Sequence, residues 1–203
     1  LKVGNIRFRC HTKQGHGLLN VEEAMQYSCN IFFYETAKLL GGKLLRKWAE
    51  NFGFGNTTDI GLAYEKKGNF PKSNSFSHTI NLSIGQGAML ATPIQIASMI
   101  ATIANGGWYT KPHILQKISD NKGNILVKNK YDLTEKIKIT EENMNIIKHS
   151  LRKVVTSGTA KKAGLKELLV AGKTGTTQTA IDDENHAWFV GYAPFENPKY
   201  CFV

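Results

Sequence analysis

Apolar residues recur at helical spacing in several stretches of the chain, and turn residues separate these stretches. Asn20, with Glu23 three positions later, is a capping-box pattern that predicts the start of a helix. Thr92 predicts another start, because Pro93 follows it at the first helical position and Gln95 completes the box. The predicted helices cover residues 21–27, 31–40, 43–52 and 93–104, and a further helix begins after Thr140 and carries an apolar stripe to Val155.

The helix over 93–104 is apolar on nearly all sides and ends at Gly106-Gly107. A helix of this kind is typical of a protein core. We therefore expect Ile96 and Met99 to be buried.

Strand patterns gather toward the end of the chain, over residues 168–176, 186–193 and 199–203. Residues 114–119 and 125–128 flank an Asp-Asn-Lys-Gly turn and predict a surface hairpin, and alternation over 79–84 predicts a short strand. The elements do not alternate regularly between strand and helix. This order favours an α/β (α+β) fold with an antiparallel sheet and packed helices, in one domain over residues 1–203.

Composition and charge narrow the function classes. The chain has 203 residues, 41% of them hydrophobic, a net charge of +10, three cysteines and six histidines. Its lysines and arginines are scattered and no nucleic-acid-binding motif is present, so we expect no nucleic-acid partner. No C-x-x-C occurs, and His11 and His16 are poorly spaced for one helix face, so we expect no metal and no cofactor.

A lysine-threonine-glycine motif follows the apolar residues Leu168–Val170. The Lys173 ammonium and the Thr174 hydroxyl suit a carboxylate, and Gly175 lets a ligand approach the backbone closely. A motif of only three residues occurs easily by chance, so the alternative interpretation is an ordinary exposed strand end without a binding role.

Ser28-x-Asn30 lies at a break between two predicted helices. Such a break presents a hydroxyl and an amide to a cleft, but Ser and Asn also favour turns and helix caps for local reasons.

In this order the two motifs match the second and third motifs of the serine acyl-transferases that include penicillin-binding proteins and class A β-lactamases. The surrounding residues extend the match over about residues 7–203, and the chain resembles the transpeptidase domain of class B penicillin-binding proteins of the elongation type. The matching segments are Gly15–Asn20, Tyr27–Tyr34, Phe52–Gly55, Ser83–Gly87, Ala91–Gln95, Ala104–Gly107, Ala171–Gln178 and His186–Pro194.

The resemblance implies a β-lactamase/transpeptidase-like fold with a five-stranded antiparallel sheet between helical layers. It implies a serine D,D-transpeptidase that cross-links D-Ala-D-Ala stem peptides of peptidoglycan and is acylated by β-lactams. On this analogy Ser28 relays a proton, Asn30 binds the substrate backbone and Lys173 shapes the electrostatics. Thr174 and Thr176 hold the terminal carboxylate beside Gly175, and the Thr176 amide completes the oxyanion hole.

The nucleophile motif S-x-x-K should precede Ser28, and no serine occurs among residues 1–27. The S-x-x-K strings at Ser119 and Ser150 fall in the predicted hairpin turn and inside a helix, and we interpret both as chance matches. We therefore expect a partial domain, incomplete at both ends, with the nucleophile outside this chain. The loop at 69–79 also looks shorter than in family members.

Two alternatives remain open: a non-catalytic penicillin-binding or sensor module, and a D,D-carboxypeptidase or β-lactamase. The resemblance further implies an inner-membrane anchor outside this chain, a periplasmic domain, and partners among cell-wall elongation proteins including a glycosyltransferase. No run of 18 apolar residues occurs here. For the thiols, we expect Cys29 and Cys201 to be buried and Cys10 to be accessible.

Overall fold

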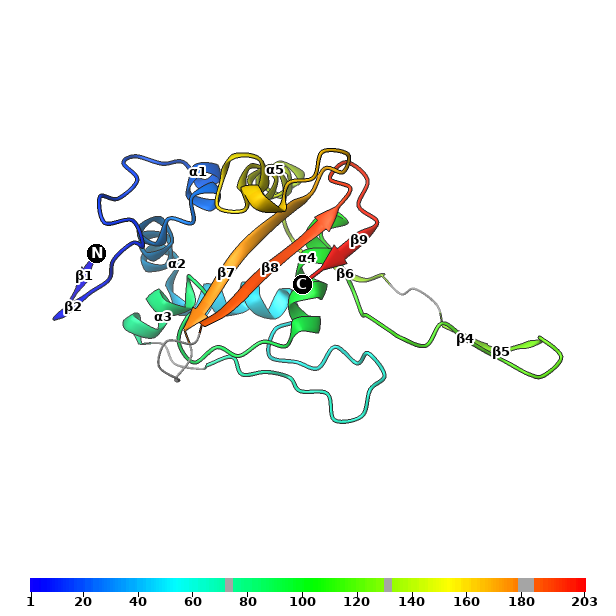
Figure 1. The fold of residues 1–203 in the computed structure, drawn as a ribbon. Helices are drawn as coiled ribbons and strands as arrows, with labels where there is room; N and C mark the ends of the chain where they lie inside the picture. The colour runs from blue at the N-terminus through cyan, green and yellow to red at the C-terminus, as the bar shows by residue number, and fades with distance from the viewer. Residues whose placement is uncertain (72–74, 130–132, 179–184) are drawn as a thin grey trace.

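The computed structural model describes residues 1–71, 75–129, 133–178 and 185–203, and it combines helices with antiparallel strands (Figure 1). The helices are α1 (Val21–Gln26), α2 (Asn30–Asn51), α3 (Phe76–Leu82), α4 (Pro93–Ala104), α5 (Glu141–Ser157) and the short 3-10 helix η1 (Lys161–Ala163). The strands are β1 (Lys2–Val3), β2 (Ile6–Arg7), β3 (Trp108–Thr110), β4 (Lys117–Ser119), β5 (Ile125–Lys128), β6 (Leu133–Lys136), β7 (Ala171–Gln178), β8 (Asn185–Ala193) and β9 (Tyr200–Phe202).

The main sheet contains β7, β8 and β9 in that order, with both pairs antiparallel. Lys173 lies opposite Val190 and Gly175 lies opposite Trp188. The lysine motif therefore lies on a strand next to the one that contains Trp188. Five strands were expected in this sheet, and the described residues contribute three.

The predicted caps form at the helix ends. Asn20 and Glu23 make the reciprocal hydrogen bonds of a capping box at α1, and Thr92 and Gln95 do so at α4. The helices predicted over 31–40 and 43–52 meet in α2, where Gly41 interrupts the helical backbone with φ 73°. A positive φ is easily adopted only without a Cβ, so this glycine makes the kink between two helical segments.

The largest core cluster joins α4, α5, β7 and β8. Its buried members are Ile100, Ile103, Ala104, Ile137, Met144, Leu151, Ala171 and Tyr192. Helix α5 packs against β7, whereas α4 packs against β8 and β9. The expectation for Ile96 and Met99 was wrong, because both are only half-buried and line a cavity beside the sheet. The side of α4 that carries Ile96 and Met99 therefore faces the cavity.

The strand predicted over Thr79–Ile84 was also wrong, because α3 occupies most of this segment. Ser75 caps α3 by accepting from the His78 amide at 3.3 Å, and the Thr79 hydroxyl donates to the Ser75 carbonyl at 3.2 Å. Ile80 is fully buried in a cluster with Phe8, Tyr34 and Ala37. A short alternation is a weak signal, and capping and packing against α2 outweigh it here.

The predicted hairpin forms from β4 and β5 and extends away from the body of the molecule (Figure 1). The Asp120 carboxylate holds its turn by accepting from the amides of Lys122 at 2.9 Å and Asn124 at 2.8 Å. Smaller pairs join β1 with β2 and β3 with β6. Residues 72–74, inside the loop expected to be short, lie outside the described residues.

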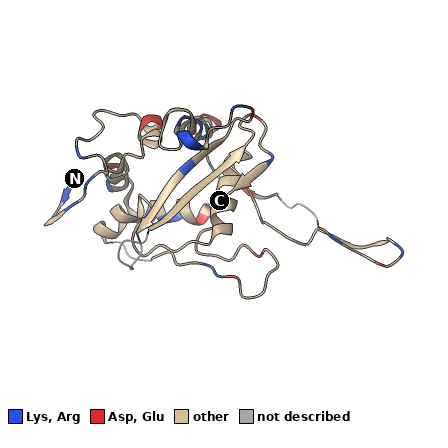
Figure 2. Cartoon of the chain, in the orientation of Figure 1, with Lys and Arg blue, Asp and Glu red and all other residues tan. Residues whose placement is uncertain are grey.

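Lysines and arginines are spread over many elements rather than gathered on one (Figure 2). This distribution agrees with the scattered pattern of the sequence. Among the helices of the described ranges, none combines the length and the apolar character that crossing a membrane requires.

Candidate active site

Ser28 lies in the tight connection between α1 and α2. Its backbone has φ 54°, the left-handed conformation that residues other than glycine seldom adopt. The Ser28 amide donates to the Met25 carbonyl at 3.2 Å and the Cys29 amide donates to Ala24 at 2.9 Å, which fixes this turn. The strained backbone thus aims the Ser28 side chain away from both helices and toward β7.

Lys173 meets Ser28 from the opposite side. Its ammonium donates hydrogen bonds to the Ser28 hydroxyl and to the Thr174 carbonyl, the latter at 2.9 Å. Burial lowers the pKa of Lys173 to about 8. A lysine with this pKa is still mostly charged at neutral pH and releases its proton at moderately alkaline pH.

A polar cleft of about 860 Å³ opens around this contact. All of the predicted site residues line it: Ser28, Asn30, Lys173, Thr174, Gly175 and Thr176. Arg9, Cys10, His11, Asn81, Ser83, Gln86 and Thr159 are also among its walls. The structure therefore brings together two motifs that lie far apart in the sequence, with α2 on one wall and β7 on the other.

Gln86 supports the β7 wall and was not singled out from the sequence. Its side-chain amide donates to the Thr176 carbonyl at 2.8 Å. This contact restrains the peptide group that directly follows the amide expected in the oxyanion hole, so Gln86 holds the backbone of β7 next to that amide. The glycine-rich segment around Gln86 resembled the family, but nothing in the sequence alone connects it to β7.

Thr159 is a second residue that the sequence did not reveal. It follows α5, and its hydroxyl lies 2.9 Å from the Thr174 hydroxyl and 3.5 Å from the Ser28 hydroxyl. A lone threonine after a helix gives no signal of such a position, because the contact depends on how α5 packs against β7 and α1.

An apolar cavity of about 780 Å³ adjoins the same strand. Lys173, Thr174, Gly175 and Thr176 line both the cavity and the polar cleft. The other walls are mainly apolar and include Trp48, Phe52, Phe54, Leu82, Met89, Ile96, Met99 and Trp188. The two hollows thus meet at the lysine-threonine-glycine motif.

The serines that line the polar cleft in the described part of the chain are Ser28 and Ser83, and the Ser83 hydroxyl donates to the Ile80 carbonyl at 2.7 Å. Ser150 is fully buried in α5 and donates to the Ile146 carbonyl at 2.6 Å. Ser119 is exposed on the projecting hairpin. The geometry agrees with the interpretation of both S-x-x-K strings as chance matches.

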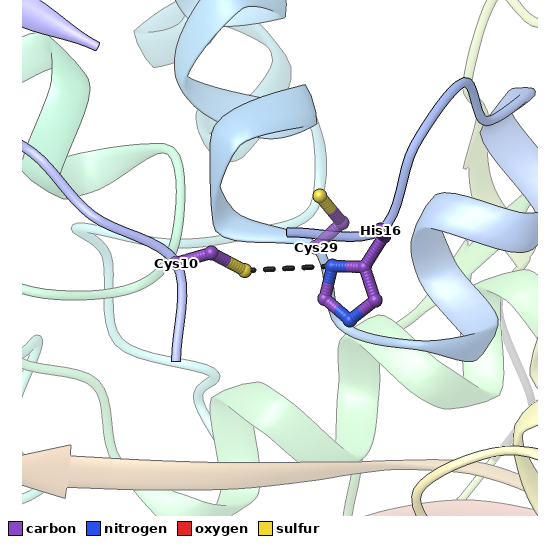
Figure 3. A group of neighbouring side chains, drawn as sticks. All are labelled: Cys10, His16 and Cys29. Atoms are coloured by element: carbon purple, nitrogen blue, oxygen red, sulfur yellow. Dashed lines mark hydrogen bonds between the residues drawn. The ribbon is translucent and has the colours of Figure 1, made fainter. Parts of the chain in front are cut away.

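Three side chains beside the cleft could hold a metal ion, namely Cys10, His16 and Cys29 (Figure 3). Their ligand atoms lie within 4.8 Å of one another, and Cys10 Sγ is 3.6 Å from His16 Nδ1. Desolvation opposes ionisation of Cys10, but hydrogen bonds from the backbone at Thr12, Asn30 and Ile31 outweigh it and lower the pKa of this thiol. Two thiols and an imidazole are ligands that suit Zn²⁺.

The sequence argument against a metal missed this group, because it considered only C-x-x-C pairs and ligands spaced along one helix. Here Cys10 and His16 come from the segment before α1, and Cys29 is the N-cap of α2. An ion at this place would tie that segment to the start of α2, next to Ser28 and Asn30.

For the remaining thiol the expectation was wrong. Cys29 is buried as expected, whereas Cys201 is exposed. The apolar neighbours of Cys201 in the sequence suggested burial. In the structure β9 pairs only with β8 among the described strands, and the Cys201 side chain is left accessible.

A family model for the penicillin binding protein transpeptidase domain matches residues 2–203. The chain belongs to this family. The resemblance inferred from the motifs is thereby confirmed, and so is the β-lactamase/transpeptidase-like fold class, because solved transpeptidase domains share the architecture.

Among curated relatives of this transpeptidase domain, the peptidoglycan D,D-transpeptidase MrdA of Acinetobacter baumannii is 33% identical over 221 residues, which cover 97% of this chain and 33% of the relative. Stage V sporulation protein D of Bacillus subtilis is 35% identical over 205 residues, which cover 98% of this chain and 32% of the relative. The chain thus spans about a third of the length of these curated relatives.

The crystal structure of Pseudomonas aeruginosa PBP2 in complex with WCK 5153 superposes with a TM-score of 0.83 at 31% identity. The match covers 98% of this chain and 47% of that one.

Proposed function

We propose that these residues form the substrate-binding and proton-relay part of a serine D,D-transpeptidase that cross-links D-Ala-D-Ala stem peptides of peptidoglycan and binds β-lactams. The observation that carries the proposal is the hydrogen bond from Lys173 to Ser28 across the polar cleft. The names of the relatives support the same activity.

Each wall of the cleft has its own role in this proposal. The Thr174 and Thr176 hydroxyls bind the terminal carboxylate, and the positive charge of Lys173 favours its approach. Asn30, on the opposite wall, hydrogen-bonds the peptide backbone of the substrate. Gly175 lets the substrate lie close to β7, and the Thr176 amide stabilises the oxyanion that forms on the attacked carbonyl.

The nucleophilic serine belongs, in this proposal, to a segment outside these 203 residues. The apolar cavity supports the idea, because an open hollow of about 780 Å³ with mainly apolar walls lies beside Lys173, and exposed apolar surface of this kind is typical of a place that another segment covers. A helix with one apolar face would fill it and bring a serine to the lysine-threonine-glycine motif.

Catalysis then proceeds in two steps. The serine oxygen attacks the D-Ala-D-Ala carbonyl, its proton passes through Ser28 to the leaving amine, and the terminal D-Ala departs. An amine of a neighbouring stem attacks the acyl-enzyme and forms the cross-link, and the proton it loses passes back through Ser28 to the serine oxygen as the acyl bond to that oxygen breaks.

The proposal includes place and partners. The complete protein would carry an inner-membrane anchor and hold this domain in the periplasm, where peptidoglycan lies. Its partners would be other cell-wall elongation proteins, including a glycosyltransferase. A similar protein, PBP2 of Helicobacter pylori, has been solved as a complex with MreC.

The test uses the complete polypeptide, a stem pentapeptide ending in D-Ala-D-Ala, and an isotope-labelled D-amino acid as acceptor. We expect mass spectrometry to detect exchange of the terminal D-Ala for the labelled residue. Hydrolysis without exchange would identify a carboxypeptidase or β-lactamase instead. Penicillin binding without turnover of the peptide would identify a sensor module.

A further inference from the structure

The loop between α5 and η1 places one hydroxyl between the two motifs of the cleft. Thr159 Oγ1 lies 2.9 Å from Thr174 Oγ1 and 3.5 Å from Ser28 Oγ. Since Lys173 donates to Ser28, a continuous chain of hydrogen-bonding groups runs from the ammonium through Ser28 and Thr159 to Thr174.

The position of Thr159 is built into the fold. Its amide donates to the Gln26 carbonyl at 3.2 Å, and the Gln26 side chain donates to the Ser157 hydroxyl at 2.9 Å. Gln26 is only 8% exposed, and a Cβ on Gly158 would lie 2.4 Å from its carbonyl oxygen. The end of α1, which leads directly into Ser28, and the loop that carries Thr159 are therefore locked together.

The number of protons in this chain restricts its direction. A hydroxyl has one hydrogen to donate, an ammonium only donates, and a carboxylate only accepts. When the Thr174 hydroxyl donates to a bound carboxylate, Thr159 must donate to Thr174 and can only accept from Ser28. Without a carboxylate, Thr174 can donate to Thr159, and Thr159 can donate to Ser28.

We infer that Thr159 is a positioning residue that couples recognition of the substrate carboxylate at Thr174 to the orientation of the Ser28 hydroxyl. With the carboxylate bound, the Ser28 hydrogen points to Thr159 while Lys173 occupies one oxygen lone pair. The other lone pair faces the cleft and is ready to accept the proton of the nucleophile, and as that proton arrives the original Ser28 hydrogen turns from Thr159 to the leaving amine. This inference rests on the proposed function, because it takes Thr174 as the carboxylate partner.

The experiment compares acylation of the complete polypeptide by benzylpenicillin and by its methyl ester, which lacks the free carboxylate. The measured quantity is the ratio of the two second-order acylation rates. We expect Thr159→Val to lower this ratio roughly 5- to 150-fold, the usual range for coupling between two sites. Thr159→Ser keeps the hydroxyl and should restore most of the ratio.

A double variant sharpens the test. If the two hydroxyls act as one unit, Thr159→Val should lower the ratio little further in a Thr174→Val background. Thr159→Ala, which removes the hydroxyl with a smaller side chain, gives the same comparison if the valine variant does not fold.

An unchanged ratio in both hydroxyl-deleting variants, or an equal fall of both rates without rescue by serine, would overturn the inference. Failure of the unaltered protein to be acylated by either compound would instead overturn the proposed function.

Discussion

The Lys173 ammonium donates a hydrogen bond to the Ser28 hydroxyl, although 145 positions separate the two residues in the sequence. Each partner is held in an unusual state by its own element. Ser28 has a left-handed backbone in the turn before α2, and Lys173 is largely buried on β7. Strain and desolvation concentrated in one contact are typical of a functional site, and both can be measured.

The burial of Lys173 predicts a specific dependence of stability on pH. Its pKa is about 8 in the folded state, below the value near 10.4 of a solvated lysine. Between these values the unfolded chain binds more protons than the folded one, so the free energy of unfolding should rise with pH. Lys173→Met should remove a rise of about 2–3 kcal/mol across this window, measured by urea denaturation. Lys38→Met, on the exposed surface of α2, is the control and should leave the rise in place.

The left-handed backbone of Ser28 predicts an order of stability between two variants that both lack the hydroxyl. Ser28→Gly should be more stable than Ser28→Ala by about 0.5–1 kcal/mol, because glycine adopts a positive φ without a steric penalty. Ser83, with φ −63°, is a matched control in which the alanine variant should be the more stable one. Equal stability of the two Ser28 variants would show that the turn is not strained.

The two sides of α4 should respond differently to truncation. Ile100 is 1% exposed in the main core, so Ile100→Ala should cost about 2–5 kcal/mol of unfolding free energy. Ile96 lines the apolar cavity, where atoms already lack neighbours on one side, so Ile96→Ala should cost less than about 1.5 kcal/mol. Similar losses at both positions, measured by denaturation, would mean that the cavity is closed in solution.

The three cysteines should separate in a thiol-labelling experiment. In the presence of a chelator, Cys10 and Cys201 should react faster than the buried Cys29. Added Zn²⁺ should protect Cys10 and Cys29 and leave Cys201 unchanged, because only the first two converge with His16. His16→Ala should weaken this protection. Mass spectrometry of the labelled peptides measures the protection of each thiol. Equal protection of Cys201 would contradict a site at this group.

The parts of the fold that local chemistry determines were predictable from the sequence. The boxes at Asn20 and Thr92, the hairpin turn at Asp120 and the break at Gly41 depend on residues a few positions apart. The segment at Ser75–Leu82 was missed, because its helix depends on burying Ile80 against α2 as well as on its cap. Burial of Ile96 and Cys201 could not be decided from apolar neighbours, since exposure depends on what packs against the outer side of each element.

The residues of the candidate site also fall into those that the sequence revealed and those that it did not. The motif residues Ser28, Asn30 and Lys173 were visible through their order and the resemblance. Thr159, Gln86 and the group at Cys10, His16 and Cys29 were not, because each reaches its partners only through tertiary packing.

The most direct test of the central claim is peptide mapping by mass spectrometry after incubation with a fluorescent penicillin. The chain of 203 residues should acquire no covalent adduct, whereas the complete polypeptide should acquire one per molecule on a serine outside residues 1–203. Lys173→Ala should strongly slow that reaction. A stoichiometric adduct on Ser28, Ser119 or Ser150 of this chain would contradict the account.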